Sequence, residues 1–164
     1  MSEDRDSLVS WAQALYRQPG VMVTLLTLQD ECGADVLLLL ASAWLWKQGL
    51  GVPAFAWPTL VAQQQPWHEE IIQPLRQVRR TLKRQDGVDT LYQQVKAVEL
   101  EAELLQLGRL QRWALTLSKP VSGTLLAQLG LLMAVGGGLD QGERLHVLLD
   151  QYAAAVARFS SQKV

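Results

Sequence analysis

Apolar side chains recur every three to four positions along most of the chain, and no segment alternates between apolar and polar residues. The first pattern is typical of amphipathic helices and the second of strands. The sequence therefore predicts an all-α protein. The predicted helices cover about residues 7–18, 21–31, 36–48, 67–85, 89–117, 125–135 and 143–159.

Glycine, proline and short polar residues mark the ends of these helices. Pro19-Gly20 ends the first helix, Gly33 is a candidate C-cap of the second, and Asp35 is a candidate N-cap of the third. Residues 49–66 contain three prolines and are predicted to be largely irregular, with at most a short helix after Pro58.

Two further breaks are expected in the second half of the chain. Pro74 lies inside the predicted helix 67–85 and should kink it or mark a junction between two helices. The three consecutive glycines at 136–138 predict a turn before the last helix.

The third predicted helix indicates how the others pack. Its sequence, VLLLLASAWLW, is apolar nearly all round, which is typical of a helix at the centre of a bundle. We therefore expect one domain over residues 1–164, with short flexible ends at about 1–6 and 160–164. The domain should be a single compact bundle of about six or seven helices. Several helices are short, which favours mixed or orthogonal packing.

Composition and the lack of targeting patterns indicate the size of the core and the cellular compartment. The chain has 164 residues, about half of them apolar, which is enough to bury a core. Its single cysteine, Cys32, permits no intrachain disulfide and fits a reducing cytoplasm. The N-terminal sequence MSEDRDSLVSW lacks the pattern of a signal peptide, and no apolar run is long enough to span a bilayer. The sequence predicts a cytoplasmic protein without a membrane span.

Charge is distributed unevenly, with eight acids and three bases in residues 1–75 but nine bases and five acids in residues 76–119. At 100° per residue, five cations share an arc of about 140° on the helix 74–84. These candidate partner- or phosphate-binding residues are Arg76, Arg79, Arg80, Lys83 and Arg84. The apolar residues roughly opposite, Ile71, Leu75, Val78 and Leu82, should face the core. The cations could form a solvated face, dock an acidic protein, or bind nucleic acid or a phosphorylated ligand.

Three carboxylates, Asp30, Glu31 and Asp35, interrupt an otherwise apolar stretch. Asp35 is explained as an N-cap, whereas Asp30 and Glu31 lie at the negative end of a helix dipole and need a cation or water. We interpret all three as structural counter-charges, with Arg79 or Arg80 as the expected partner. A magnesium–diphosphate site is the alternative, but the carboxylates are irregularly spaced and no second acidic motif faces them.

The remaining candidates are aromatic residues and histidines. Trp57, within the predicted irregular stretch, is a candidate exposed contact, with simple packing as the alternative. His68 and His146 have no matched nucleophile or acid, and no phosphate loop, dinucleotide fingerprint or zinc motif is present. The sequence therefore predicts no catalytic, cofactor-binding or metal-binding residue and no cofactor.

Two segments also carry a family resemblance. WAQALYRQPGV with LTLQDECGADVLLLLASAWL, followed by PLRQVRRTLK, resembles a small family of proteobacterial conserved hypothetical proteins, a domain of unknown function. The resemblance covers about residues 8–84. It implies a compact bacterial cytoplasmic protein and transfers no catalytic residue.

Together these observations favour a non-enzymatic interaction or regulatory protein that docks another protein through the basic helix. A nucleic-acid-binding module using the same cations is the first alternative. A small helical enzyme or ligand-binding protein with a pocket between helices is the second. A homodimer is also compatible with the leucine-rich helices.

Overall fold

The computed structural model describes residues 7–135 and 142–159, and it is all-α, as predicted. The helices are α1 (Leu8–Tyr16), α2 (Val21–Cys32), α3 (Val36–Lys47), α4 (Trp57–Trp67), α5 (Gln73–Leu82), α6 (Asp89–Leu117), α7 (Leu125–Val135) and α8 (Gly142–Arg158). A 3₁₀ turn, η1 (Ala54–Ala56), precedes α4, and a π-helical segment, η2 (His68–Ile72), joins α4 to α5. No described helix combines the length and apolar character that a bilayer crossing needs. The predicted glycine turn at 136–138 and the predicted flexible ends at 1–6 and 160–164 lie outside the described residues.

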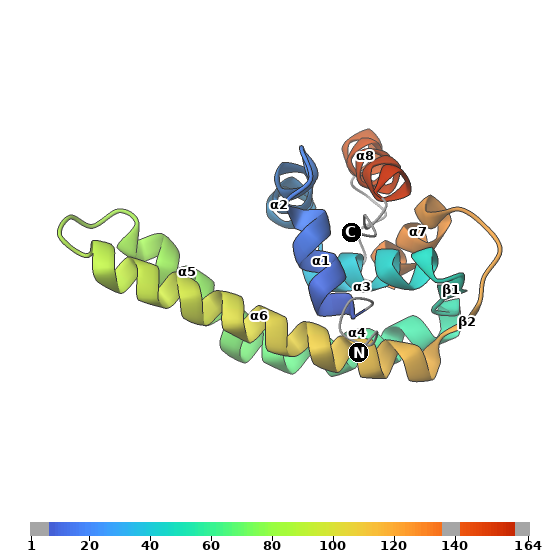
Figure 1. Ribbon diagram of the computed structural model, residues 1–164, viewed down its shortest axis with the longest axis horizontal. Coiled ribbons are helices and arrows are strands. Elements are labelled where there is room, and N and C mark those ends of the chain that lie inside the picture. Colours follow the sequence, from blue (N-terminus) through green and yellow to red (C-terminus); the bar gives the residue numbers. More distant parts are fainter. Residues whose placement is uncertain (1–6, 136–141, 160–164) are drawn as a thin grey trace.

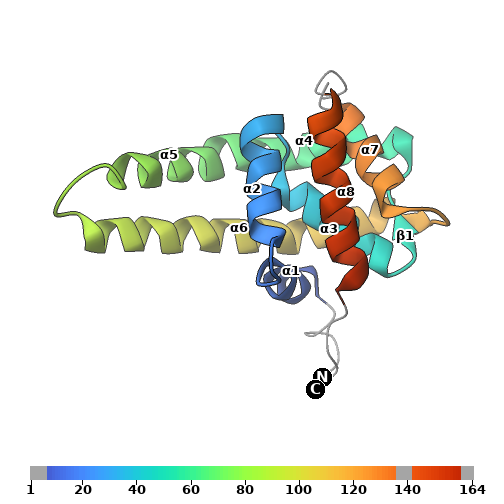
Figure 2. The same cartoon turned by 90° about the horizontal axis from the view of Figure 1, so that it is seen from above.

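The architecture is built on one long antiparallel pair of helical rods. One rod is the continuous run α4–η2–α5, and the other is α6. In Figure 1 the remaining helices all lie on one side of this pair. Figure 2 shows that α2 and α8 run across the pair, so the packing is mixed. Beyond this body, α5 and the first part of α6 project as a helical hairpin. We call residues 73–98 the arm.

The core is centred on α3, as its apolar sequence predicts. Every residue from Leu37 to Leu45 is buried. This helix contacts α1, α2, α6 and α7, so it has no face left for polar side chains. The buried hydroxyl of Tyr152, on α8, donates a hydrogen bond of 3.1 Å to the Leu39 carbonyl. The last helix is thereby fixed to the central one.

A two-residue β-bridge, which the periodicity did not predict, closes one end of the body. β1 (Leu50–Gly51) pairs antiparallel with β2 (Lys119–Pro120) and joins the segment after α3 to the segment after α6. Two residues are too few to produce an alternating pattern. A Cβ at Gly51 would lie 2.7 Å from the side-chain oxygen of Gln128 and 3.2 Å from the Cβ of Val121, so a larger residue would require these neighbours to shift.

The prediction that residues 49–66 are mainly irregular was wrong. Helix α4 already starts at Trp57, and Pro58 lies in its first turn, where no backbone N–H is needed. Pro66 is inside the helix and removes one backbone hydrogen bond. Burial of Trp57 and Leu60, together with contacts to α6 and α7, offsets that loss. Tertiary packing therefore outweighs the local proline signal.

The predicted junction at Pro74 is confirmed. The Gln73 N–H donates to the His68 carbonyl five residues earlier, which makes the turn before Pro74 wider than an α-turn. Helix α5 then starts at Gln73, with Pro74 in its first turn. The rod consequently continues through the proline instead of ending there.

Candidate interaction site on the helical arm

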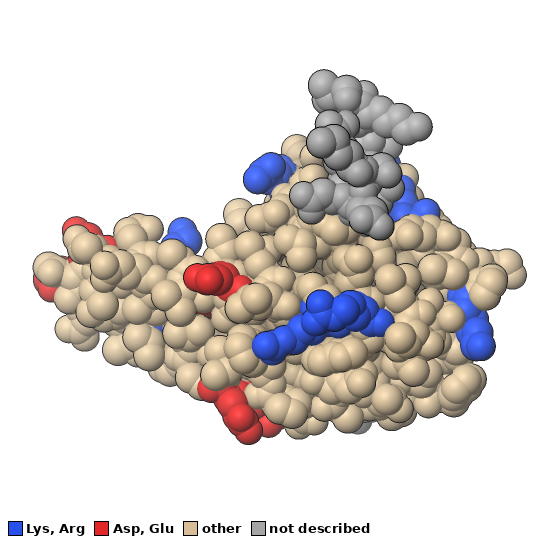
Figure 3. Space-filling view, turned by 60° about the horizontal axis from the view of Figure 1, so that its bottom comes forward, with Lys and Arg blue, Asp and Glu red and all other residues tan. Residues whose placement is uncertain are grey.

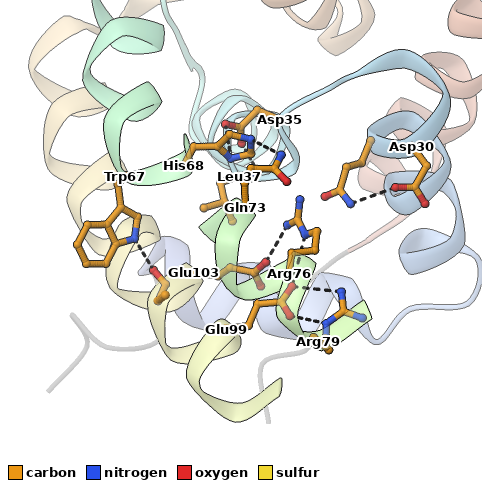
Figure 4. Close-up of polar contacts among 12 residues, drawn as sticks. Asp30, Asp35, Leu37, Trp67, His68, Gln73, Arg76, Arg79, Glu99 and Glu103 are labelled. Atoms are coloured by element: carbon orange, nitrogen blue, oxygen red, sulfur yellow. Dashed lines mark hydrogen bonds and ion pairs between the residues drawn. The ribbon is translucent and has the colours of Figure 1, made fainter. Parts of the chain in front are cut away.

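A buried ion cluster joins the two helices at the base of the arm. Arg76, on α5, donates from Nε to Glu99 at 3.4 Å and from Nη2 to Glu103 at 3.1 Å. Arg79, one turn later, also pairs with both oxygens of Glu99. In Figure 4 both guanidinium groups point from α5 toward the carboxylates of α6. Two of the five candidate cations are thus neutralised inside the protein.

This cluster reverses the orientation that the sequence predicted for the basic helix. Arg76 is buried, whereas Ile71 and Val78, assigned to the core side, are 37% and 47% exposed. The prediction was wrong because it placed cations in solvent by default. Here α6 presents Glu99 and Glu103 to α5, and paired charges are a stable way to bury an arginine.

Electrostatics within the cluster follow from burial and pairing. The hydrogen bond from Arg79 to Glu99 raises the pKa of the Arg79 guanidinium. Burial raises the pKa of the Glu103 carboxyl, against the opposing effect of Arg76. Burial also raises the pKa of the nearby Tyr16 phenol on α1. Arg79 therefore stays charged, and Glu99 is the carboxylate that contacts both arginines.

The predicted pairing of the acidic stretch with the arginine row is correct for one residue only. Arg80 Nη2 lies 3.1 Å from Asp30 Oδ1, which confirms Arg80 as a partner. Glu31 instead pairs with Arg144 of α8 at 2.9 Å, 113 residues away, and this interaction lowers the pKa of Glu31. Both pairs are exposed to solvent, so neither contributes much to stability.

Asp35 is the N-cap of α3, as predicted. Its Oδ1 accepts from the backbone N–H groups of Leu37 and Leu38 at 2.9 and 3.3 Å. Its other oxygen accepts from the Gln64 side chain at 3.0 Å and lies 3.5 Å from Nδ1 of His68. Asp35 therefore links the start of the central helix to the α4–η2 rod. Nothing in the sequence indicated this second function.

We expect Asp35→Ala to lower the free energy of unfolding by about 2 kcal/mol, because it removes an N-cap and leaves Gln64 without its acceptor. Asp35→Asn should lose much less, since its side-chain oxygen can still cap the helix. Urea unfolding monitored by circular dichroism measures both. Asp30→Ala, at an exposed pair, is the control and should change stability by less than about 0.5 kcal/mol. An Asp35→Ala variant with an unchanged free energy of unfolding would contradict the capping function.

The prediction that Trp57 is an exposed contact was wrong. Its side chain is 1% exposed and fills the core under the start of α4, whereas Phe55, two residues earlier, is 81% exposed. His68 contacts Gln73 and Asp35, and His146 is exposed on α8. Over residues 7–135 and 142–159, no three His, Cys, Asp or Glu side chains gather closely enough to hold a metal ion.

With this geometry described, comparison with known proteins identifies the family. Residues 7–110 match the family described as "Protein of unknown function (DUF2390)". The chain belongs to this family. The match confirms that the region of resemblance, residues 8–84, belongs to a domain of unknown function, and it extends this region beyond α5 into α6. The comparisons with curated proteins and with solved structures gave no match.

In this DUF2390 protein, three of the five candidate cations stay accessible. Lys83 and Arg84 are exposed at the end of α5 and have no acidic partner among the described residues. Arg80 is exposed but shares its charge with Asp30. We call Arg80, Lys83 and Arg84 the cationic patch.

A shallow groove of about 310 Å³ lies between the two rods on the side away from the body. Trp67 and Trp113 contribute aromatic walls, and Glu70 and Arg109 contribute charge. The Arg109 guanidinium stacks 4.3 Å from the centre of the Trp67 ring. This groove is one place where the predicted pocket between helices could lie, and the residues that line it include no pair of nucleophile and base.

Proposed function

We propose that this DUF2390 protein is a non-enzymatic interaction or regulatory protein of the bacterial cytoplasm. It acts as a single helical domain and docks a partner protein with an acidic surface through the cationic patch on its arm. The observation that carries this proposal is the unpaired charge of Lys83 and Arg84 on a helical hairpin that projects from the body.

Position and rigidity support the arm as the docking element. The Arg76, Arg79 and Glu99 cluster fixes α5 against α6, so the arm can present its cations on a rigid scaffold. Arg80 lies in the last turn of α5, and Lys83 and Arg84 follow directly after its end. All three are exposed, so a partner can reach them without the arm unfolding.

Nucleic-acid binding by the same cations is a less supported use of this patch. Affinity for a phosphate backbone depends on the number of phosphates that cations neutralise. Burial of Arg76 and the pairing of half-buried Arg79 with Glu99 leave three cations, one of them shared with Asp30. An acidic protein surface needs fewer contacts of this kind, because its own apolar groups also contribute.

A native pull-down from bacterial lysate tests the proposal, with and without nuclease. The bait pair is wild type and Arg80→Glu/Arg84→Glu, which changes the patch and spares the buried cluster. The matched control is Lys119→Glu/Arg158→Glu, which changes the net charge equally at exposed positions elsewhere. We expect one protein to bind wild type and the control, to survive nuclease, and to lose about 90% of its recovery with the patch variant.

Two outcomes would contradict protein docking by this patch. Recovery of RNA or DNA, with all captured protein lost after nuclease, would assign the patch to nucleic acid. Equal recovery by all three baits would show that the patch is only solvated. Circular dichroism must first confirm that each variant is folded.

A further inference from the structure

Two rows of apolar side chains run along the face of the helical pair that is opposite the body. On the first rod Ile71, Leu75, Val78 and Leu82 are spaced by four, three and four residues. On α6 Leu91, Val98 and Leu105 are spaced by seven, which returns them to nearly the same side of the helix. We call these two rows the apolar face.

Contacts with the body show that most of this face is uncovered, although Leu75 is half-buried and packs against the core. At 100° per residue, Arg80, which pairs with Asp30 of α2, points about 160° away from the first row. Gln111 of α6 accepts a hydrogen bond from Leu8 of α1 and points about 140° away from the second row. The body therefore packs on the other side of both rods, as Figure 1 shows.

Exposure is concentrated in these rows. Leu91, Val98 and Leu105 are 49%, 50% and 54% exposed, and Ile71 and Val78 are also exposed. Five of the twelve large apolar side chains that are exposed among the described residues thus lie in these two rows. Figure 3 shows this side of the molecule, where charged side chains over the arm are few and separate.

The size of the face suits a small dimer interface. From Leu91 to Trp113, α6 extends about 33 Å, and two helices side by side are about 20 Å wide. Each copy could therefore contribute about 650 Å², or about 1,300 Å² for two copies, which reaches the lower end of stable interfaces. A single partner helix would cover only about half of this width.

Charge along the rods makes the face complementary to itself. Near the base of the arm, the first rod has the acidic Glu70 and α6 has the basic Arg109. At the tip the signs are reversed, because Lys83 follows the first rod and Asp86 lies in the turn that leads to α6. A twofold axis parallel to the helices would place the first rod of one copy over α6 of the other. Each acidic end then meets a basic end at both tip and base.

The same axis also matches the apolar residues. The Arg79–Glu99 pair places Val78 near the level of Val98 within one chain. A rotation about an axis along the helices keeps that level, so Val78 of one copy faces Val98 of the other. All neighbouring helices in the resulting four-helix layer are antiparallel, which is a favourable arrangement for their dipoles.

We infer that the apolar face binds a second copy of this chain, forming a twofold symmetric dimer through a four-helix bundle of the rods. Arg80 points to the side of α5 opposite the first apolar row, so the dimer leaves this cation accessible. Lys83 lies at the tip of the arm, where it meets Asp86 of the other copy, so the dimer interface and the cationic patch share this residue.

Sedimentation equilibrium of the full chain over a range of concentrations tests the inference. We expect wild type to have twice the mass of the chain at micromolar concentrations. Val78→Glu and Val98→Glu should each raise the dissociation constant at least about 100-fold, because a charge becomes buried without a partner. Val23→Glu on α2 and Val147→Glu on α8 are matched controls at exposed valines outside the face, and they should leave the dimer intact.

Cysteine cross-linking checks the twofold axis. A mixture of Val78→Cys and Val98→Cys chains should form mixed disulfide dimers faster than either chain alone. A wild type that stays monomeric to about 100 µM, or dimers equally sensitive to the control variants, would overturn the inference. Faster self-cross-linking of each single variant would overturn the axis. None of these results depends on the pull-down, since its patch variant leaves the apolar face unchanged.

Discussion

Glu99→Gln should lower the free energy of unfolding by about 3–5 kcal/mol, the largest effect we expect from a single charge change. Glu99 is the only carboxylate that contacts both Arg76 and Arg79 in the described structure. Its loss leaves Arg79 without an ion-pair partner and Arg76 with Glu103 alone. Urea unfolding at a fixed protein concentration and pH 7 measures the change, because any dimer would link stability to concentration.

Two further variants show whether the effect of Glu99→Gln comes from the lost ion pairs or from a change in side-chain packing. Glu101→Gln, on the exposed side of the same helix, should change stability by less than about 0.5 kcal/mol. Glu99→Leu combined with Arg76→Met, Arg79→Leu and Glu103→Gln should recover most of the loss, since neutral groups of similar volume can replace a buried ion cluster. A loss below about 1 kcal/mol for Glu99→Gln would show that water, not Glu99, solvates the arginines.

Trp57→Ala should lower the free energy of unfolding by about 3–5 kcal/mol through the cavity that it leaves at the start of α4. Trp57→Phe should lose much less, because it keeps a ring in the core and removes an indole N–H without an acceptor among the described residues. Thermal and urea unfolding measure both variants.

Phe55→Ala is the matched control for this prediction. Phe55 is aromatic and lies two residues before Trp57, yet its ring is mostly in solvent. Its truncation should change stability by less than about 0.5 kcal/mol. Equal effects of Phe55→Ala and Trp57→Ala would mean that the segment before α4 packs differently, with Trp57 in the contact position that the sequence suggested.

The sequence predicts elements well where a single helix carries its own signals. The range of α6 follows from its apolar spacing together with the Asp86-Gly87 turn and Lys119-Pro120. The Gly33 and Asp35 caps were also predictable, because capping depends on residues within one turn. The start of α4 was not predictable in this way, since its prolines read as breaks until packing against α6 and α7 is known.

The candidate site shows the same division. Composition and a helical wheel identified the five cations and their shared side of α5. They could not say that α6 brings Glu99 to Arg76 and Arg79 from 20 or more residues away. Composition and the helical wheel also could not predict that Arg144 forms an ion pair with Glu31, because these residues are 113 positions apart in the chain.

The sequence by itself determined the helical class, most helix ends, the buried central helix and the cationic character of α5. These properties depend on the spacing of apolar residues and on caps within one or two turns. Only the tertiary structure decided which side of α5 faces inward, which cations remain free and which apolar rows lie uncovered. Those properties depend on which distant side chains meet, and a helical wheel contains no information about the partner of either face.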